Sequence, residues 1–495
     1  MLEWFCKTPK GRESSMKQTD WKIIYTAYEG VAKRAVHLLS KEVGAFLIRE
    51  PSVYRICVLP CEKEGCAISK NAFFVGCYEE SNVIKDFVRP HEVPQDGFLV
   101  KVIKNPSDAE GRFVILTAHD VQELFYAAVS FFDDYIPRYA PTHGSNRMPD
   151  LIFDGPLAEC AYTETPDHKT RSIFTWGHSI NDYRAYIDNM ARLKFNELIL
   201  WNDYVPLNIK DVIAYAHSYG IKVNLGYSWG WQVHCSQVDD ISDASLLALK
   251  DAILAKYEKE YADTGCDGIY FQSFTERRDE YIGKRLIAEG VVSLVNMTAN
   301  ELLAKHPALK LQFGLHATSV AGHLDEIAKV DPRVELLWED CGEFPYHYRT
   351  FVQDEKSYQD TLAFTKKMLT LRGGVGVGLV FKGVMMLDWS KFVNQQGPYI
   401  LGENSPKIAA HDRAVRANAW REYAADWMHN GARVAQTLRF IQENKLGEVN
   451  MCIAGTFDGG IYLPFALCAQ MYRNCSEDYA EILRKVTRRA CITVD

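Results

Sequence analysis

At 495 residues the chain is longer than a single hydrophobic core usually serves, so its length favours two or more domains. Its composition, 47% hydrophobic and 24% charged, is typical of a globular protein, and the formal net charge of -8 argues against nucleic acid as a partner. The first residues lack the pattern of an export signal, and no apolar run approaches the roughly 18 residues of a membrane span, which predicts a cytoplasmic protein without a membrane partner.

The thirteen cysteines are odd in number and scattered along the chain, which indicates reduced thiols and not a disulfide framework. Four of them cluster early in the sequence, at Cys57, Cys61, Cys66 and Cys77. Their spacing lacks the paired Cys-x-x-Cys and the nearby His of a zinc site. We therefore expect neither a metal nor a cofactor.

Residues 1–150 are expected to form a small α/β accessory domain. Turn residues separate three strand-like stretches: Tyr54 to Leu59, Phe98 to Ile103 and Phe113 to Leu116. A helix follows, in which Asp120 can cap the first turn with Glu123 three residues on, and apolar residues then repeat at helical spacing. Pro137 and Pro141 begin a loop-like stretch that marks the domain boundary.

Residues 165–495 alternate short apolar strands with amphipathic helices, the pattern of repeated βα units and a parallel sheet. Eight strands are predicted: Ser172 to Trp176, Glu197 to Trp201, Lys222 to Tyr227, Gly268 to Phe271, Lys310 to Leu315, Val334 to Trp338, a shorter piece of Val375 to Leu387, and Val449 to Ala454. Eight such units predict a closed (β/α)8 TIM barrel. The last pair is the least regular, because a helical stretch from Ala409 to Gln442 separates its strands.

Aromatic, acidic and amide side chains follow the predicted strands. Substrate sites in such barrels lie at the carboxyl ends of the strands, so these residues are the candidates for a site. They are Trp176 and His178; Trp201, Asn202 and Asp203; Tyr227, Trp229 and Trp231; Gln272 and Glu276; His316; Trp338, Glu339 and Asp340; and Asp388. Indole rings can stack on the apolar face of a sugar while carboxylates and amides bind its hydroxyls. The pattern favours an oligosaccharide or glycoside as the substrate.

Cleavage of a glycosidic bond needs one carboxyl group that protonates the departing oxygen, and usually a second one. Glu276, just past the fourth strand, is the candidate acid. Glu339 and Asp340 are the leading candidates for the second group, ahead of Glu343 and Asp388. Structural roles remain open for several of these residues: Glu276 could pair with a neighbouring arginine, Asp340 could cap a turn, and the two histidines could simply be packed.

Three aromatic residues lie within the five-residue run Tyr227-Ser-Trp-Gly-Trp231. They could form a hydrophobic plug or a stacking surface for a sugar. Because the two tryptophans flank a glycine in a turn region, where a plug would be hard to bury, the sugar surface is favoured.

Other classes of active site are not indicated. The sequence has no HExxH, GxSxG or P-loop motif. The glycine-rich run from Gly373 to Gly378 follows a predicted helix and enters a strand, whereas a phosphate loop follows a strand and enters a helix.

The chain resembles the barrel glycosidases of glycoside hydrolase families 20, 67, 84 and 163. The resemblance rests on the α/β domain before the barrel, on the segment from Arg171 to Trp176 followed by Tyr186 to Asn196 and a strand ending in Trp201-Asn-Asp203, and on Glu276 after the fourth strand. By this resemblance Arg171 would grip hydroxyls of the terminal sugar, and Glu276 would be the acid.

The resemblance implies hydrolysis of a β-N-acetylhexosaminide, with one departure. Family 20 enzymes have an Asp before the acid that orients the substrate acetamido group, and this chain has Thr275 there. A hydroxyl cannot balance the charge of an oxazolinium-like intermediate. An α-glucuronidase-like uronide hydrolase remains an alternative, although Arg171 and Lys382 are among the few basic residues near the strand ends. A sugar-binding barrel without catalysis is the other alternative.

Overall fold

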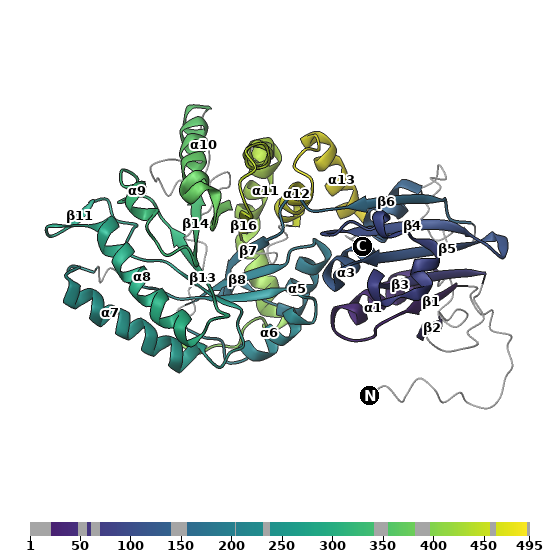
Figure 1. Cartoon of the computed structure of the whole chain (residues 1–495), viewed down its shortest axis with the longest axis horizontal. Coiled ribbons are helices and arrows are strands. Elements are labelled where there is room, and N and C mark those ends of the chain that lie inside the picture. The colour runs from purple at the N-terminus through teal and green to yellow at the C-terminus, as the bar shows by residue number, and fades with distance from the viewer. Residues whose placement is uncertain are drawn as a thin grey trace. The chain divides into compact units, whose positions relative to one another are not determined.

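The structure of the protein is a computed structural model. It describes residues 21–47, 57–60, 70–139, 156–202, 204–230, 238–340, 355–381, 397–455 and 462–492. The chain divides into two compact units, Met1–Thr165 and Pro166–Asp495, which are drawn in Figure 1.

The first unit contains a mixed sheet with the strand order β2-β1-β3-β5-β4-β6. Strands β1, β2, β3 and β5 are parallel, whereas β4 is antiparallel to both β5 and β6. The strands are β1 (Trp21–Tyr25), β2 (Cys57–Pro60), β3 (Asn71–Cys77), β4 (Phe98–Asn105), β5 (Asp108–Ala118) and β6 (Cys160–Glu164). The predicted α/β class is confirmed, and sequence patterns missed β1, β3 and β6.

Apolar residues cover both faces of this sheet, because successive side chains of a strand point to opposite sides. Phe73 packs edge-on against Phe131, which follows α3, whereas Phe74 packs against Phe87 of α2. The helices are α1 (Gly30–Leu47), α2 (Asn82–Phe87), α3 (Val121–Ser130) and α4 (Ile136–Tyr139). The Asp120 side chain caps α3 as predicted, by accepting hydrogen bonds from the backbone N–H groups of Gln122 and Glu123.

The second unit is a closed barrel of eight parallel strands in the order β10-β13-β14-β15-β16-β7-β8-β9 (Figure 1). The strands are β7 (Arg171–Trp176), β8 (Glu197–Trp201), β9 (Lys222–Gly226), β10 (Gly268–Phe271), β13 (Lys310–Leu315), β14 (Val334–Asp340), β15 (Val377–Phe381) and β16 (Asn450–Ala454). The predicted TIM barrel, preceded by a small α/β domain, is therefore confirmed. The irregular last pair also has its predicted helix, α11, between β15 and β16.

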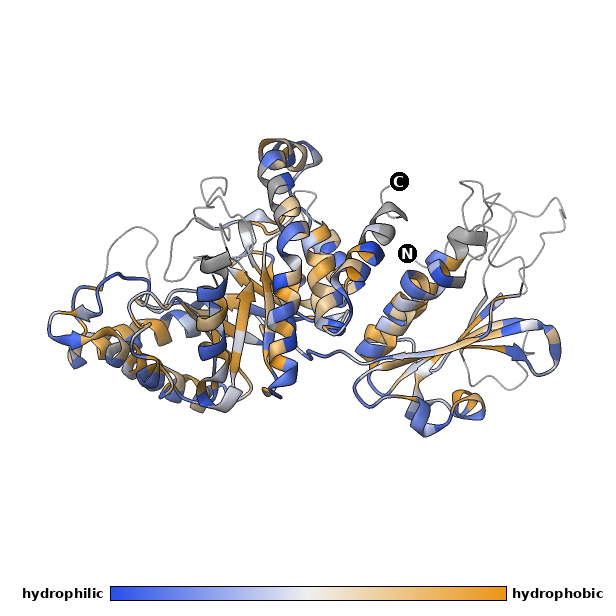
Figure 2. Ribbon diagram, turned by 90° about the horizontal axis from the view of Figure 1, so that it is seen from above, coloured by the Kyte–Doolittle hydropathy of each residue, from blue (hydrophilic) through white to orange (hydrophobic). Residues whose placement is uncertain are grey.

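Helices follow the barrel strands. They are α5 (Tyr183–Arg192), α6 (Ile209–His217), α7 (Asp243–Lys256), α8 (Ile287–Lys305), α9 (Leu324–Ile327), α10 (Glu355–Thr370), α11 (Pro406–Glu443), α12 (Tyr462–Arg473) and α13 (Tyr479–Ile492). A short hairpin, β11 (Tyr281–Ile282) and β12 (Arg285–Leu286), precedes α8. In Figure 2 the barrel strands are mostly hydrophobic, whereas the surrounding helices carry both hydrophobic and polar positions, as expected for helices packed against a sheet on one side.

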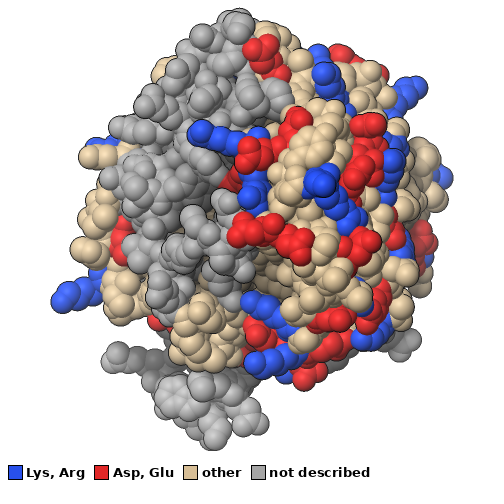
Figure 3. All heavy atoms as spheres, turned by 90° about the vertical axis from the view of Figure 1, so that its left-hand side faces the viewer, with Lys and Arg blue, Asp and Glu red and all other residues tan. Residues whose placement is uncertain are grey.

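Shorter helical turns complete the two units. They are η2 (Tyr78–Glu80), η3 (Pro90–Glu92), η4 (Phe131–Tyr135), η6 (Gly177–Ser179), η7 (Tyr257–Tyr261) and η8 (Leu371–Gly374). Acidic and basic side chains intermingle on the face drawn in Figure 3, without an extended area of one sign. Among the described residues, none of the helices is both long and apolar enough to cross a membrane.

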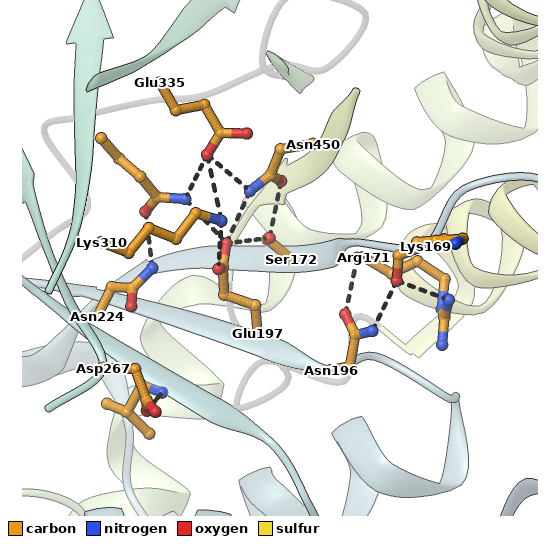
Figure 4. A network of polar contacts seen from close by, with 12 residues as sticks. Lys169, Arg171, Ser172, Asn196, Glu197, Asn224, Asp267, Lys310, Glu335 and Asn450 are labelled. Carbon is orange, nitrogen blue, oxygen red and sulfur yellow. Dashed lines mark hydrogen bonds and ion pairs between the residues drawn. The ribbon is translucent and has the colours of Figure 1, made fainter. Parts of the chain in front are cut away.

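A polar network fills the amino end of the barrel and joins strands that are far apart in sequence (Figure 4). Glu197 of β8, which is almost fully buried, forms an ion pair of 2.8 Å with Lys310 of β13. Its other oxygen accepts hydrogen bonds from Ser172, Gln312 and Asn450. Because these donors surround the carboxylate of Glu197, the network can hold the strands together without leaving that charge unpaired.

The two carboxyl groups of this network differ in charge preference. Burial disfavours ionisation of Glu197, but Lys310 and the hydrogen bonds outweigh it and lower its pKa from about 4.5 to about 2. Burial raises the pKa of Glu335, with Glu197 adding to the rise and Lys310, 3.2 Å away, opposing it. Glu197 is therefore the ionised partner of Lys310, whereas Glu335 has the higher pKa of the two carboxyl groups.

This difference predicts unequal losses of stability for two matching substitutions. Glu197→Gln should lower the free energy of unfolding at pH 7 by about 3 kcal/mol, because it leaves Lys310 without its main counter-charge. The contribution of a carboxyl group with a lowered pKa is complete above pH 4.5 and is lost as the pH falls toward 2, so the deficit should shrink in acid. Glu335→Gln should cost little at pH 7. Urea unfolding of both variants at pH 7 and pH 3 checks this, and equal losses at pH 7 would contradict it.

Candidate functional site

Four of the predicted site residues meet at the carboxyl ends of three adjacent strands. Gln272 directly follows β10, and Glu276 lies four residues farther along the same loop. His316 follows β13, and Glu339 lies near the end of β14. Since β13 pairs with both β10 and β14, the barrel brings these side chains to one side of its mouth. We call them the acid wall.

Glu339 is the centre of the acid wall. Its side chain is only 1% exposed. One carboxylate oxygen accepts hydrogen bonds from the Tyr270 hydroxyl and from Gln272 Nε2, the latter at 2.5 Å, and the other lies 3.0 Å from His316 Nε2. A buried carboxylate is stable only with such partners, because each missing one would leave charge without solvation.

His316 lies between two carboxyl groups. Its Nε2 faces Glu339, and its Nδ1 lies 3.6 Å from Glu276 Oε2. The side chain of Glu276 is 17% exposed, so it is the more accessible of the two acids. One imidazole ring thus separates the two carboxyl groups.

Tyr270 donates a hydrogen bond to Glu339, and Gly314 leaves the space for this contact. Burial, and then the charge of Glu339, raise the pKa of Tyr270 well above its usual range, so its hydroxyl stays protonated and donates. Gly314 faces this contact, and a Cβ atom there would overlap the Tyr270 hydroxyl and crowd Glu339 Oε1. The acid wall therefore requires a residue without a side chain at position 314.

Trp176 and Trp201 lie on the side of the barrel opposite the acid wall, where Trp176 is half-buried and Trp201 is buried, and we call the pair the indole wall. The two residues are register partners on β7 and β8. In the closed strand order, β7 and β8 lie across the barrel from β13 and β14. The Trp201 ring packs edge-on against Tyr270 inside the barrel, with the ring centroids 6.0 Å apart. Asn202 is half-buried beside this wall and donates a hydrogen bond to the backbone of Tyr204.

Arg171 does not reach this mouth, which corrects the predicted sugar contact. It is the first residue of β7 and therefore lies at the amino end of the barrel, near the network of Figure 4. Its guanidinium group is buried and donates hydrogen bonds to the backbone carbonyls of His168, Lys169 and Lys194. Arg171 thus fixes chain segments at the end of the barrel that is remote from Glu276.

Three aromatic residues predicted to contact sugar are packing residues instead. Trp229 has no exposed surface and stacks on Phe271, with centroids 3.6 Å apart. Tyr227 is also fully buried and stacks on Tyr261. Trp338 points out of the barrel, where its Nε1 donates a hydrogen bond of 3.2 Å to Thr365 of α10. The hydrophobic plug, not the sugar surface, is the correct interpretation for Tyr227 and Trp229.

Several predicted residues lie outside the part of the chain that the structure describes. They are Asp203, Trp231, Glu343, Lys382 and Asp388, together with the side chains of His178 and Asp340. Among the described residues, no group of three or more His, Cys, Asp or Glu side chains could hold a metal ion.

Sequence reasoning missed Tyr270 and Gly314 as parts of the site. Tyr270 was assigned to a buried apolar run, yet it lies two residues before Gln272, so both side chains point the same way from β10. That alternation was the available signal for Tyr270. Gly314 offered none, because only the position of its neighbours explains the glycine.

Comparison with known proteins finds likeness in fold. No protein-family model and no curated protein sequence matches this chain. It is similar to the solved structure of a family 20 β-N-acetylhexosaminidase from Streptomyces coelicolor A3(2), with 11% identity, a TM-score of 0.52 and coverage of 95% of this chain and 91% of that one. A family 115 4-O-methyl-α-glucuronidase with specificity for decorated arabinogalactans gives 13% identity, a TM-score of 0.50 and coverage of 96% and 59%. The chain therefore shares the fold of these barrel glycosidase structures.

The packing around Gly314 predicts that Gly314→Ala disrupts the acid wall. The new methyl group must push away Tyr270 or Glu339, so the free energy of unfolding should fall by about 1 to 3 kcal/mol. Gly322→Ala is the matched control, because the nearest atom to its Cβ would be Glu280 Oε1 at an ordinary 3.5 Å. Urea unfolding of both variants measures the difference. A loss in the control as large as in Gly314→Ala would show that the crowding at position 314 is not the cause.

Proposed function

We propose that the protein is a glycoside hydrolase in which Glu276 is the general acid. The observation that carries the proposal is the pair of carboxyl groups, Glu276 and Glu339, on the two sides of His316 at the mouth of the barrel. A protein that only binds sugar has no need for a carboxyl group positioned to share a proton in this way. The barrel fold, common to the glycosidase structures named above, supports the proposal without deciding the reaction.

The proposed role of His316 follows from its two contacts. Glu339 is ionised, because the neighbouring tyrosine, amide and imidazole can all donate to it, and it therefore holds the proton of His316 on Nε2. Nδ1 of the neutral ring then offers a lone pair toward Glu276. In its protonated form Glu276 can pass its proton to the departing oxygen of the substrate, while water adds to the anomeric carbon and completes hydrolysis.

Glu339 has a supporting role in this proposal. Because its side chain is almost fully buried and its oxygens are occupied, it acts on the substrate through His316 and not by direct attack. This revises the expectation that Glu339 is the second carboxyl group that acts on the glycosidic bond. The sugar would lie between the two walls, with its apolar face toward Trp176 and Trp201 and its glycosidic oxygen toward Glu276.

A β-N-acetylhexosaminide is the favoured substrate. A uronide is the second candidate, and it would need basic side chains at the mouth to balance its carboxylate. Arg171 lies at the other end of the barrel, and Arg277 donates a hydrogen bond to the backbone of Val238. These positions favour an uncharged sugar over a uronate. The similar structures of families 20 and 115 span both substrate classes.

Glu276→Gln tests the assignment of the acid. Hydrolysis of 4-nitrophenyl N-acetyl-β-glucosaminide should fall by about 100-fold to 10,000-fold, since the amide cannot donate the proton of a carboxylic acid. Binding of the sugar, measured by calorimetry, should persist. Glu280→Gln is the matched control, because Glu280 lies on the same loop with a side chain that is 51% exposed. The activity of this variant should equal that of the wild type.

The outcome of this experiment separates the candidate functions. Unchanged turnover in Glu276→Gln would remove Glu276 from the mechanism. If the wild type hydrolyses only the 4-nitrophenyl glucuronide from a panel of aryl glycosides, the uronide alternative is correct. If it binds sugars but hydrolyses none of the panel, the protein is a sugar-binding barrel.

The environment of Thr275 predicts a mechanism without attack by the substrate acetamido group. Thr275 is fully buried, and its carbonyl accepts hydrogen bonds from the backbone N–H and the hydroxyl of Ser319. Its side chain is an uncharged hydroxyl group, which offers no charge to an oxazolinium-like intermediate. Replacing the N-acetyl group of the aryl glycoside by N-trifluoroacetyl weakens the acetamido oxygen as a nucleophile. We expect kcat to change by less than about threefold. A fall of several orders of magnitude would show that the acetamido group does attack.

A further inference from the structure

We propose that Ser319, on the loop after β13, is a positioning residue for Glu276. It would act through the peptide bond that precedes the acid, without touching the substrate. This inference rests on the proposed function and deepens it, because it states what holds the acid in place.

Ser319 holds the residue before the acid by two hydrogen bonds. Its backbone N–H donates to the Thr275 carbonyl at 3.2 Å, and its hydroxyl donates to the same oxygen at 2.8 Å. Both residues are fully buried. Since one donor already satisfies a buried carbonyl group, the hydroxyl adds a second constraint on the direction of this group.

The Thr275 carbonyl is rigidly connected to Glu276. A peptide bond is planar, so this carbonyl and the backbone nitrogen of Glu276 belong to one rigid unit. The orientation of that unit sets where the side chain of Glu276 begins. The far end of the side chain lies beside the same loop, because Glu276 Oε2 is 3.6 Å from Nδ1 of His316. The loop after β13 therefore meets the acid at its backbone and at its carboxyl group.

The loop that carries His316 and Ser319 is itself ordered by hydrogen bonds. The N–H of Val320 donates to the carbonyl of Ala317 at 3.2 Å, and the N–H of His323 donates to the carbonyl of Val320 at 2.9 Å. Ala317 and Val320 are fully buried. Such a loop can hold the acid without first losing the conformational entropy that ordering a free segment would cost.

The segment from Gln272 to Glu276 is also bonded on its other side, to the loop after β9. The Ser273 hydroxyl donates to the Trp229 carbonyl at 2.8 Å, and the Trp229 N–H donates to the Gln272 carbonyl at 2.9 Å. These bonds remain when the Ser319 hydroxyl is removed. Its loss should therefore loosen the acid without unfolding the segment.

Substrates that differ in their leaving group separate positioning of the acid from a general loss of structure. The phenolate of 2,4-dinitrophenol departs with little protonation, whereas 4-methoxyphenol needs a proton from the acid. Both groups would be attached to N-acetyl-β-glucosamine, or to glucuronic acid if the panel assigns a uronide. Ser319→Ala should lower kcat/KM about tenfold for the 4-methoxyphenyl glycoside and by less than about twofold for the dinitrophenyl glycoside, because a displaced acid hampers only the departure that needs a proton.

Thr298→Val is the matched control. It removes a fully buried hydroxyl that donates to a backbone carbonyl, that of Leu294, at 2.7 Å within α8. The ratio of kcat/KM for the two glycosides should match that of the wild type. This ratio does not depend on the fraction of protein that is folded, so a less stable variant still gives an answer. If Ser319→Ala does not fold, Ser319→Cys is measured in the same way, because a thiol is a weak donor of similar size.

Glu276→Gln shows which proposal fails. It should lower kcat/KM by about 100-fold or more for the 4-methoxyphenyl glycoside and far less for the dinitrophenyl glycoside. If it does so, but Ser319→Ala affects both glycosides equally or neither, the positioning role of Ser319 is overturned and the acid stands. If Glu276→Gln affects both glycosides equally, Glu276 is not the acid and both proposals are rejected.

Discussion

The buried charge of Glu339 is the constraint on which the candidate site depends. A carboxylate with 1% exposure would be expelled or neutralised in an apolar interior unless donors surround it. Tyr270, Gln272 and His316 supply those donors from two neighbouring strands, and Gly314 leaves the space in which they meet. Because the donors come from β10 and from the end of β13, the charge is satisfied only when the barrel is closed in the correct register. The same arrangement orients His316 toward Glu276.

The barrel interior contains two polar layers with different purposes. In the lower one, Lys310 balances Glu197, and amide and hydroxyl groups complete the set of partners. In the upper one, Glu339 contacts the Tyr270 hydroxyl, the Gln272 amide and the His316 imidazole, and the imidazole also lies beside Glu276. A layer that balances its own charge stabilises the fold, whereas a layer that holds two acids around one ring is suited to moving a proton.

The mouth above the upper layer is divided between chemistry and binding. Glu276 follows β10 and Glu339 lies on β14, whereas the indoles lie on β7 and β8. The proposed sugar would lie between the two walls, with the reacting bond facing Glu276.

The sequence by itself determined the architecture, because strand and helix periods are local and eight βα units have one common way to bury their apolar faces. It also predicted that Glu276, Gln272, His316 and Glu339 lie close together, since residues at the carboxyl ends of neighbouring parallel strands meet at one end of the barrel. It could not separate Trp176 and Trp201 from Trp229 and Trp338, because whether an indole points into a barrel or against a helix depends on the exact register of each strand end. The predicted sugar contact of Arg171 was wrong for a related reason. Arg171 is the first residue of β7, and similarity of sequence does not say which end of the barrel a side chain occupies. Only the tertiary structure decided these positions, since burial and charge pairing arise from residues that lie far apart in the chain.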